Sequence, residues 1–424
     1  MNEPTGAQTP GTEEGVGERA IDALLAQARY AAPHELPELV TEQAVRLGAL
    51  DATIYLVDLQ QVSLTPFIGQ AGPGAAPRPT LLPVDSTVAG RVHQHGQAIV
   101  QPGPETGATV WLPLHDGATR LGVLSVHVAD PDDVATPQDR LSVWLGRFAS
   151  LVGQLVALRA RYGDSIVVAT RSAEVGLAAE IQWGLLPPLT FASAQVSVAG
   201  ILEPAYDVAG DSVDYAVDPG VARIAIFDGM GHGLRSAQLA ALSVAAYRNA
   251  RRGGRSLTAT AAAIDEAVEA GSGGESYTTA VLAELDTGTG QLSWVNAGHP
   301  EPLLLRQGQL VRSLHVDPGL PFGLGLRDTD HAYAVGTEQL EPGDQVLFHT
   351  DGVTEARSPA GDQFGVDRLV DLLARTVAEN LTPAESMRRV GRELLAHQEA
   401  HLTDDATLLL LHWPGQAVAG EGPG

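Results

Sequence analysis

Hydrophobic residues recur with helical spacing near the start of the chain. From Ile21 the apolar positions return every three or four residues, and a second stretch with the same spacing covers residues 36–47. This periodicity predicts two amphipathic helices. Residues 1–18 lack the pattern and are rich in Gly, Pro, Thr and Glu, so we expect a disordered tail there.

Three apolar runs with strand character follow the two helices, at residues 52–57, 109–114 and 123–128. A proline-rich loop at 72–83 separates the first run from the second, and the polar residues 115–120 predict a hairpin turn between the second and third. Helices that flank a small set of strands predict an α+β fold, here an α/β sandwich over residues 19–160.

A long helical stretch is expected to begin near Pro137. Its apolar residues alternate in spacings of four and three: Leu141, Leu145, Phe148, Val152 and Leu155. The spacing fits two structures, a short coiled-coil seam and a helix that packs on its own domain. A further helix is expected over 172–186, because Pro187 and Pro188 cannot continue it. Residues 161–188 are therefore expected to form a helical connector.

A second domain is expected over residues 189–414, with a flexible tail at 415–424. Seven runs in it have strand character: 196–202, 222–227, 278–285, 292–296, 303–306, 345–350 and 406–413. Three helical segments interrupt them, at 235–251, 257–270 and 367–397, and Pro383 is expected to break the last. Mixed antiparallel sheets with helices outside, an α-β-β-α sandwich, is the architecture that this order favours.

Composition removes several kinds of chemistry. The chain has no cysteine, and all 26 basic side chains are arginine. A thiolate nucleophile, a cysteine-ligated zinc site, a lysine Schiff base and the lysine of a phosphate-binding loop are therefore excluded. The formal net charge of −25 disfavours nucleic acid and anionic membranes as partners. No secretion signal or membrane-spanning run is evident, so we expect a cytoplasmic protein.

Aspartates stand where the apolar runs of the second domain begin or end. Asp228 follows 222–227, Asp351 follows 345–350, and Asp404 precedes 406–413; Asp211 comes shortly after 196–202. Strand ends can bring such side chains into one cleft, where several carboxylates would repel one another. Divalent cations resolve that conflict, and two such ions can activate a water for attack on phosphorus. The pattern therefore predicts a site for Mn²⁺ or Mg²⁺.

Residues 180–413 resemble the sporulation-stage-II and sigma-regulator branch of the metal-dependent Ser/Thr protein phosphatases, the PPM superfamily. The stretches that carry the resemblance are 180–182, 185–188, VAGD at 208–211, FDGMGHG at 227–233, NAGHP at 296–300, 340–344, TDGVTE at 350–355 and DDAT at 404–407. They occur in the order of the family, which implies a PPM-type sandwich fold.

The resemblance also implies roles for individual residues. Asp228 would bridge two Mn²⁺ or Mg²⁺ ions, and the carbonyl of Gly229 would bind one of them. Asp351 and Asp404 would complete the other site, and Asp211 would be a ligand directly or through water; a third ion stays an open alternative. Asp228 and Asp351 would then be the catalytic residues, with a metal-bridging hydroxide attacking phosphoserine or phosphothreonine without a phosphoenzyme intermediate.

Some positions depart from the family pattern. Ser212 and Val213 replace an aromatic pair, Met230 stands where eukaryotic relatives have an acid histidine, and Glu301 interrupts a proline run. The leaving alkoxide would then take its proton from water or from His232. Accessory roles are expected for Asp214, His232 and Asp405. None of the departures removes an expected metal ligand, so an active enzyme is expected.

Residues 20–160 resemble a GAF sensor domain by their order of helices and strands. Small-molecule sensing and dimerisation are both open uses for such a domain. His93, His95 and His127 could bind haem or a metal, but structural roles are the commoner outcome for isolated histidines.

The sequence thus predicts a metal-dependent Ser/Thr protein phosphatase regulated by a GAF-like domain through the connector. The family implies a phosphorylated anti-sigma-factor antagonist as substrate, partner switching as the context, and a homodimer through the GAF-like domain and connector helices. Two alternatives stay open: a catalytically silent scaffold that binds its partner, and a phosphatase of a small phosphorylated metabolite.

Overall fold

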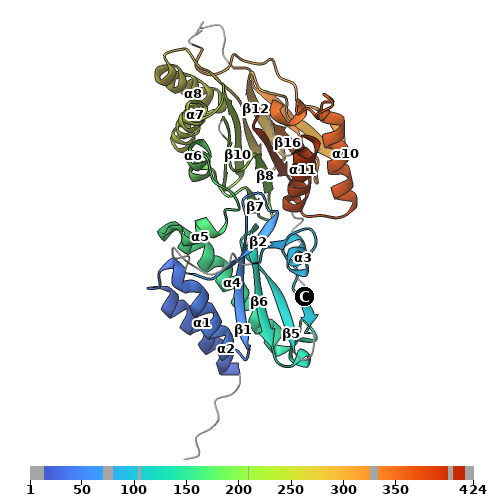
Figure 1. Cartoon of the computed structure of the whole chain (residues 1–424). Helices are drawn as coiled ribbons and strands as arrows, with labels where there is room; N and C mark the ends of the chain where they lie inside the picture. Colours follow the sequence, from blue (N-terminus) through green and yellow to red (C-terminus); the bar gives the residue numbers. More distant parts are fainter. Residues whose placement is uncertain are drawn as a thin grey trace, which may run out of the picture. The chain divides into compact units, whose positions relative to one another are not determined.

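The chain folds into two compact units, Met1–Ser172 and Ala173–Gly424, in a computed structural model (Figure 1). The structure describes residues 14–69, 80–103, 107–208, 210–324, 333–399 and 404–415. Most of the two expected tails, most of the expected loop at 72–83 and Ala209 of the VAGD stretch lie outside the described residues. The boundary between the units falls within the connector expected at 161–188.

The first unit is built on a six-stranded antiparallel sheet with the order β3-β2-β1-β6-β5-β4. Its strands are β1 (Asp51–Val57), β2 (Ser63–Phe67), β3 (Leu82–Pro83), β4 (Ile99–Pro102), β5 (Ala108–Asp116) and β6 (Thr119–Val128). Its helices are α1 (Glu14–Ala28), η1 (Pro33–Glu35), α2 (Leu36–Arg46), α3 (Val88–His95), η2 (Pro131–Val134), α4 (Arg140–Arg159), η3 (Ala160–Tyr162) and α5 (Asp164–Ala169). The expected α/β arrangement is confirmed, and α1 begins inside the expected tail.

Side chains alternate between the two faces of the sheet, so the first unit has one hydrophobic cluster on each face. On β1, Ile54 and Leu56 face the core shared with α1, α2 and α4, whereas Tyr55 and Val57 face the small cluster under α3. The expected hairpin between β5 and β6 is present, with Gly117 at a positive φ in its turn. Strands β2 to β4 and helix α3 were not predicted from the sequence.

Helix α4 packs inside its own unit, so the coiled-coil interpretation of its apolar residues is wrong. Leu145, Phe148 and Val152 are fully buried in the core of the first unit. Asp139 is the residue before the helix, and its side chain accepts a hydrogen bond from the amide of Thr136 (2.5 Å), so α4 begins at Arg140 rather than near Pro137 as expected. Contrary to the sequence expectation, Arg140–Tyr162 is long and apolar enough to cross a membrane, a property that core helices share.

The second unit has two antiparallel sheets. One has the order β15-β12-β11-β10-β9 and the other β14-β13-β16-β17-β8-β7. Their strands are β7 (Thr190–Ala192), β8 (Ser197–Glu203), β9 (Asp211–Asp218), β10 (Val221–Gly229), β11 (Thr278–Asp286), β12 (Gln291–Ala297), β13 (Leu303–Arg306), β14 (Gln309–Ser313), β15 (Gly336–Gln339), β16 (Gln345–His349) and β17 (Ala406–His412). The helices are α6 (Leu177–Leu185), α7 (Leu234–Arg252), α8 (Leu257–Ser272), α9 (Asp351–Thr354), α10 (Gly365–Ala378) and α11 (Pro383–His397).

Three apolar layers hold this unit together. Residues such as Ile224 and Phe348 fill the space between the sheets, α7 and α8 cover the outer face of the first sheet, and α10 and α11 cover that of the second (Figure 1). The result is the expected α-β-β-α sandwich. The break expected at Pro383 is confirmed, because that proline starts α11.

The helix expected over 172–186 is shorter than predicted. Helix α6 begins at Leu177, because Gly176 is extended and its amide donates to the carbonyl of Tyr206 (2.8 Å). The residues before α6 are therefore held against the second unit rather than in a continuous connector helix.

Candidate functional site

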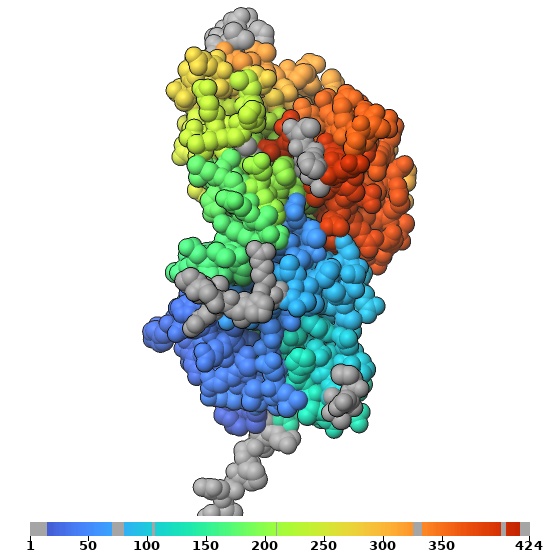
Figure 2. Space-filling model, viewed as in Figure 1, coloured from blue at the N-terminus to red at the C-terminus, as the bar shows by residue number. Residues whose placement is uncertain are grey.

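Five aspartates of the second unit lie at the ends of strands from both sheets. Asp211 opens β9 and pairs across the sheet with Asp228 of β10. Asp351 follows β16, and Asp404 and Asp405 precede β17. In Figure 2 the green atoms of the β9–α7 region adjoin the red atoms of the carboxy-terminal segment, and the amide of Gly210 donates to the carboxylate of Asp405 (2.6 Å). We call these five residues the carboxylate cluster.

The hydroxyl of Thr350 fixes the two sheets at the cluster. Its Oγ1 donates to Oδ2 of Asp211 (2.8 Å) and accepts from the amide of Thr407 (3.0 Å). The end of β16 and the starts of β9 and β17 are therefore tied by one side chain. No role was predicted for Thr350, although a hydroxyl residue between a buried strand and Asp351 is a signal that could have been used.

Burial and mutual repulsion raise the pKa values of Asp211, Asp228 and Asp404 in the cluster. The carboxyl of Asp211 is buried, and its pKa is well above the ordinary value because of desolvation, then the charges of Asp228 and Asp405; hydroxyls of Thr407 and Thr350 partly oppose the shift.

The same causes raise the pKa values of Asp228 and Asp404. Desolvation, followed by the charges of Asp351, Asp404 and Asp405, raises the pKa of Asp228 to about 7. The pKa of Asp404 is raised mainly by desolvation, against a hydrogen bond from the amide of Asp405. The charges that raise these pKa values all belong to carboxylates, so a cation among them would relieve the repulsion.

The donor set fits a hard divalent cation. Carboxylate and carbonyl oxygens are the ligands of Mg²⁺ and Mn²⁺, and burial with mutual repulsion is the condition that such a cation removes. As the side chains stand, the described residues contain no group of three or more His, Asp or Glu placed to hold one ion. For these residues to hold a metal, carboxylates among Asp211, Asp228, Asp351 and Asp404 would have to turn toward a common centre.

The carbonyl of Gly229 is held by the first turn of α7. Ser236 Oγ donates to it (2.7 Å), and the neighbouring Gly210 fits closely against both groups. A Cβ at Gly210 would lie 2.4 Å from Ser236 Oγ and 2.7 Å from the Gly229 oxygen, so a larger residue would displace this carbonyl. No sequence pattern marked Ser236 as part of the site.

Two expected accessory residues do not join the cluster. Asp214 is buried on β9 but lies on the face opposite Asp211, because side chains alternate along a strand. Its Oδ1 accepts from Arg248 Nη2 (2.7 Å), and its Oδ2 lies 3.2 Å from Arg251 Nη1, both on α7. His232 is exposed in the loop between β10 and α7.

His299 is a buried structural neighbour of the site. Its Nδ1 lies 2.8 Å from Oγ1 of Thr279. Thr279 of β11 pairs directly with Asp228 of β10. Burial, with a smaller effect of His349, lowers the pKa of His299 to about 3, so its imidazole is neutral at pH 7. It cannot supply a proton as an imidazolium at that pH.

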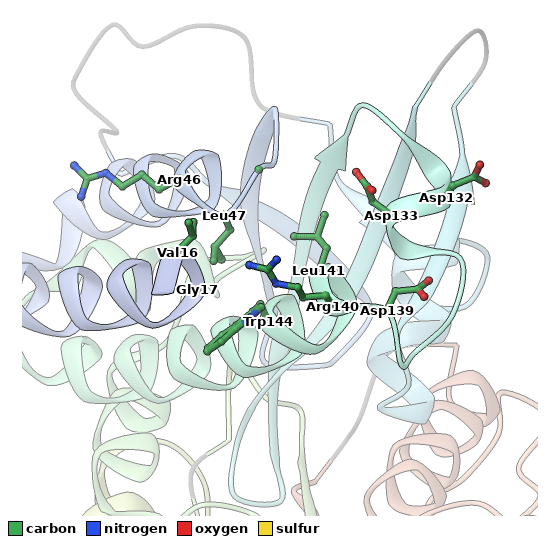
Figure 3. Close-up of a pocket in the computed structure, with 11 residues that line it drawn as sticks. Val16, Gly17, Arg46, Leu47, Asp132, Asp133, Asp139, Arg140, Leu141 and Trp144 are labelled. Carbon is green, nitrogen blue, oxygen red and sulfur yellow. The ribbon is translucent and has the colours of Figure 1, made fainter. Parts of the chain in front are cut away.

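The first unit contains a cavity of about 600 Å³ beside the amino-terminal end of α4 (Figure 3). Arg46, Arg140 and Trp144 line it together with Asp132 and Asp133. The histidines that were considered as haem or metal ligands lie elsewhere: His93, His95 and His127 are absent from its lining. Among the described residues, no three of His, Asp or Glu are grouped so as to hold one ion.

Comparison with known proteins defines the class of the second unit. Residues 218–414 match the family model of Stage II sporulation protein E (SpoIIE). The matched residues include Asp228, Asp351 and Asp404, and the match supports a PP2C-type phosphatase domain for this part of the second unit.

The relatives include the phosphoserine phosphatase RsbU of Bacillus subtilis, 25% identical over 240 residues, or 56% of this chain and 69% of that protein. Protein IcfG of Synechocystis sp. is 27% identical over 137 residues, which cover 32% of this chain and only 20% of that protein. Among solved structures, the SiaA-PP2C domain of Pseudomonas aeruginosa is 23% identical with a TM-score of 0.46, covering 61% of this chain and 99% of that one.

Proposed function

We propose that the chain is a metal-dependent Ser/Thr protein phosphatase that hydrolyses phosphoserine or phosphothreonine on a regulatory protein. The observation that carries the proposal is the carboxylate cluster, in which burial and repulsion raise the pKa values of Asp211 and Asp228. The match of residues 218–414 to the SpoIIE model supports this function.

Asp211, Asp228, Asp351 and Asp404, with the carbonyl of Gly229, are the residues proposed to hold two Mn²⁺ or Mg²⁺ ions. When bound, such ions supply an activated water and neutralise charge on the phosphoryl group. Other side chains of the protein hold these proposed ligands in position. Thr350 keeps Asp211 at the junction of the sheets, and Ser236 keeps the Gly229 carbonyl in place.

The leaving oxygen needs a proton, for which water and His232 are the two candidates. His232 is exposed beside Asp228 in sequence, whereas His299 is buried and neutral. A His232→Ala variant separates the candidates, because loss of a general acid lowers kcat by ~10²-fold or more and proton transfer from water leaves kcat nearly unchanged.

The substrate that we propose is a phosphorylated anti-sigma-factor antagonist, in a cytoplasmic partner-switching system. The name of the relative RsbU, a phosphoserine phosphatase, supports a phosphoserine substrate. We further propose that the first unit is a GAF-like regulatory domain and that the protein is a homodimer. Because Leu145, Phe148 and Val152 of α4 are buried, a dimer would use exposed residues such as Leu158, Tyr162 and Val168 instead.

The function is tested by incubating the purified protein with a phosphorylated antagonist. The antagonist is prepared with phosphoserine and with phosphothreonine, and small phosphate esters are assayed in parallel. We expect Mn²⁺-dependent release of phosphate from the protein substrate. Asp228→Ala or Asp351→Ala should abolish release, because each removes a proposed ligand, while circular dichroism shows an unchanged fold.

The same assay distinguishes the two alternatives. Tight binding of the antagonist without hydrolysis would indicate a silent scaffold. Turnover confined to the small esters would indicate a metabolite phosphatase. Activity of the Asp228→Ala variant that persists in EDTA would contradict a metal-dependent site.

A further inference from the structure

Asp405 differs from the other members of the carboxylate cluster in what its side chain contacts. Its Oδ2 accepts hydrogen bonds from two consecutive backbone amides, those of Gly210 (2.6 Å) and Asp211 (3.2 Å). A carboxylate oxygen that accepts from two amides is engaged in strong, charge-assisted hydrogen bonds. The turn that places Asp211 at the start of β9 is therefore held by a residue that lies 195 positions after Gly210 and 194 positions after Asp211 in the sequence.

The backbone of Asp405 is also fixed, at the segment that carries Asp351. A Cβ built on Gly352 would lie 1.9 Å from the carbonyl oxygen of Asp405, so the two backbones are in close contact there. Gly352 belongs to α9, the helix that begins at Asp351. Asp405 thus lies between two segments, each of which carries one of the proposed ligands.

Asp404 contrasts with its neighbour. Asp404 is exposed, and its Oδ1 accepts a hydrogen bond from the amide of the adjacent Asp405 (2.9 Å). Within the described residues no hydrogen bond ties its carboxylate to a distant segment, so it can turn toward an ion. The two adjacent aspartates thus differ in role: Asp404 is available to bind an ion, and Asp405 holds the protein backbone.

We propose that Asp405 is a positioning residue, which sets the place of Asp211 through the Gly210 and Asp211 amides and is not itself a metal ligand. The inference rests on the proposed function for its effect on metal binding, whereas the backbone anchoring that it describes exists without metal. Partners that orient ligands commonly change metal affinity by ~10–100-fold when they are removed.

An asparagine side chain tests the proposal, because its oxygen can accept the same two hydrogen bonds but carries no charge and therefore binds a hard cation more weakly than a carboxylate does. Four full-length proteins are compared: the natural chain, D405N, D405A and the matched variant D404N. Mn²⁺ affinity is measured by calorimetric titration, and thermal unfolding is measured in EDTA. Phosphate release is followed over a range of Mn²⁺ concentrations.

We expect D405N to bind Mn²⁺ within about five-fold of the natural chain, and D405A and D404N to bind ~10–100-fold more weakly. Excess Mn²⁺ should restore much of the kcat of D405A but not that of D404N. In EDTA, D405A should unfold at a lower temperature than D405N, since only the asparagine keeps the anchor.

Two results would overturn the proposal: Mn²⁺ binding by D405N as weak as that by D404N, or binding by D405A as tight as that of the natural chain. If D405A does not fold, the comparison of D405N with D404N decides. If the natural chain binds no Mn²⁺, the proposed function fails, and the anchor is then judged in EDTA, where equal unfolding temperatures for D405A and D405N would refute it.

Discussion

At the residue scale, burial and repulsion between the carboxylates of the cluster destabilise the metal-free fold. Asp211 and Asp228 are next to each other in the β9–β10 ladder, and both are largely removed from water. Each would be more stable protonated, which is why their pKa values rise. The site is therefore costly to the fold until a cation arrives, as is common for residues retained for chemistry rather than stability.

This cost predicts a dependence of stability on pH in the absence of metal. The pKa of Asp228 is raised from 3.8 to about 7, so between these pH values the folded state binds more protons than the unfolded state. The stabilisation due to the protonated group is present at low pH and is lost as the pH rises through about 7. We expect Asp228→Asn, which cannot ionise, to remove this loss.

The measurement is the free energy of unfolding in EDTA, by urea denaturation at pH 5.5 and pH 8. The difference between Asp228→Asn and the natural chain cancels the contributions of other groups. We expect the stability of the variant relative to the natural chain to rise between pH 5.5 and pH 8, by on the order of 1–3 kcal/mol. A relative stability that stays the same or falls over this range would contradict the raised pKa, and added Mn²⁺ should stabilise only the natural chain strongly.

At the scale of elements, burial decides which of them can be recognised in the sequence. Strands β10 and β17 are nearly continuous apolar runs, because they are covered on both faces, and both were predicted. Strand β14 is exposed throughout and β15 alternates between half-buried and exposed residues, so neither has an apolar run to detect. Strand β9 was missed because its buried positions include Asp211 and Asp214.

The residues of the candidate site also differ in whether the sequence alone could reveal them. Asp228, Asp351 and Asp404 were predicted because an aspartate at the end of an apolar run is visible in one sequence. The roles of Thr350 and Ser236 depend on contacts between segments far apart, which the sequence does not show. Asp214, for which an accessory role was expected, lies on the opposite face of the strand that carries Asp211, which the motif alone does not show.

The ion pairs of Asp214 predict a structural role for that residue, linking α6, α7 and β9. Arg248 donates both to Asp214 and to the carbonyl of Leu185 at the end of α6 (2.6 Å). Because Asp214 is buried, Asp214→Ala leaves two arginines without their counter-charge, and we expect a loss of about 3–5 kcal/mol in the free energy of unfolding. Urea denaturation at pH 7 measures it.

A control for this prediction is the exposed pair of Glu42 and Arg46, one turn apart on α2. Glu42→Ala should change the free energy of unfolding by less than about 1 kcal/mol, because solvent screens that pair. Equal effects of the two substitutions would show that burial of Asp214 adds nothing to its ion pairs.

At the scale of the whole molecule, the two units have separate hydrophobic cores. The core of the first unit is formed by residues up to Ile166, and the cores of the second begin at Ala178. The carboxylate cluster, Thr350 and Ser236 all lie in the second unit, so no part of the proposed catalytic site comes from the first. The first unit is therefore free to act as a regulator without being required for the chemistry.

This separation predicts that residues 173–424 fold without the first unit and retain Mn²⁺-dependent phosphatase activity. Regulation by the first unit predicts a difference from the full chain of at least about five-fold in kcat/KM, the lower range of ordinary coupling between sites. Circular dichroism and gel filtration should show a folded species, and Asp228→Ala in the same fragment should remove its activity. Equal kcat/KM and equal oligomeric state in the fragment and the full chain would refute coupling between the units. A folded fragment without activity would instead show that the site depends on the first unit, since its expected ligands are all present in the fragment.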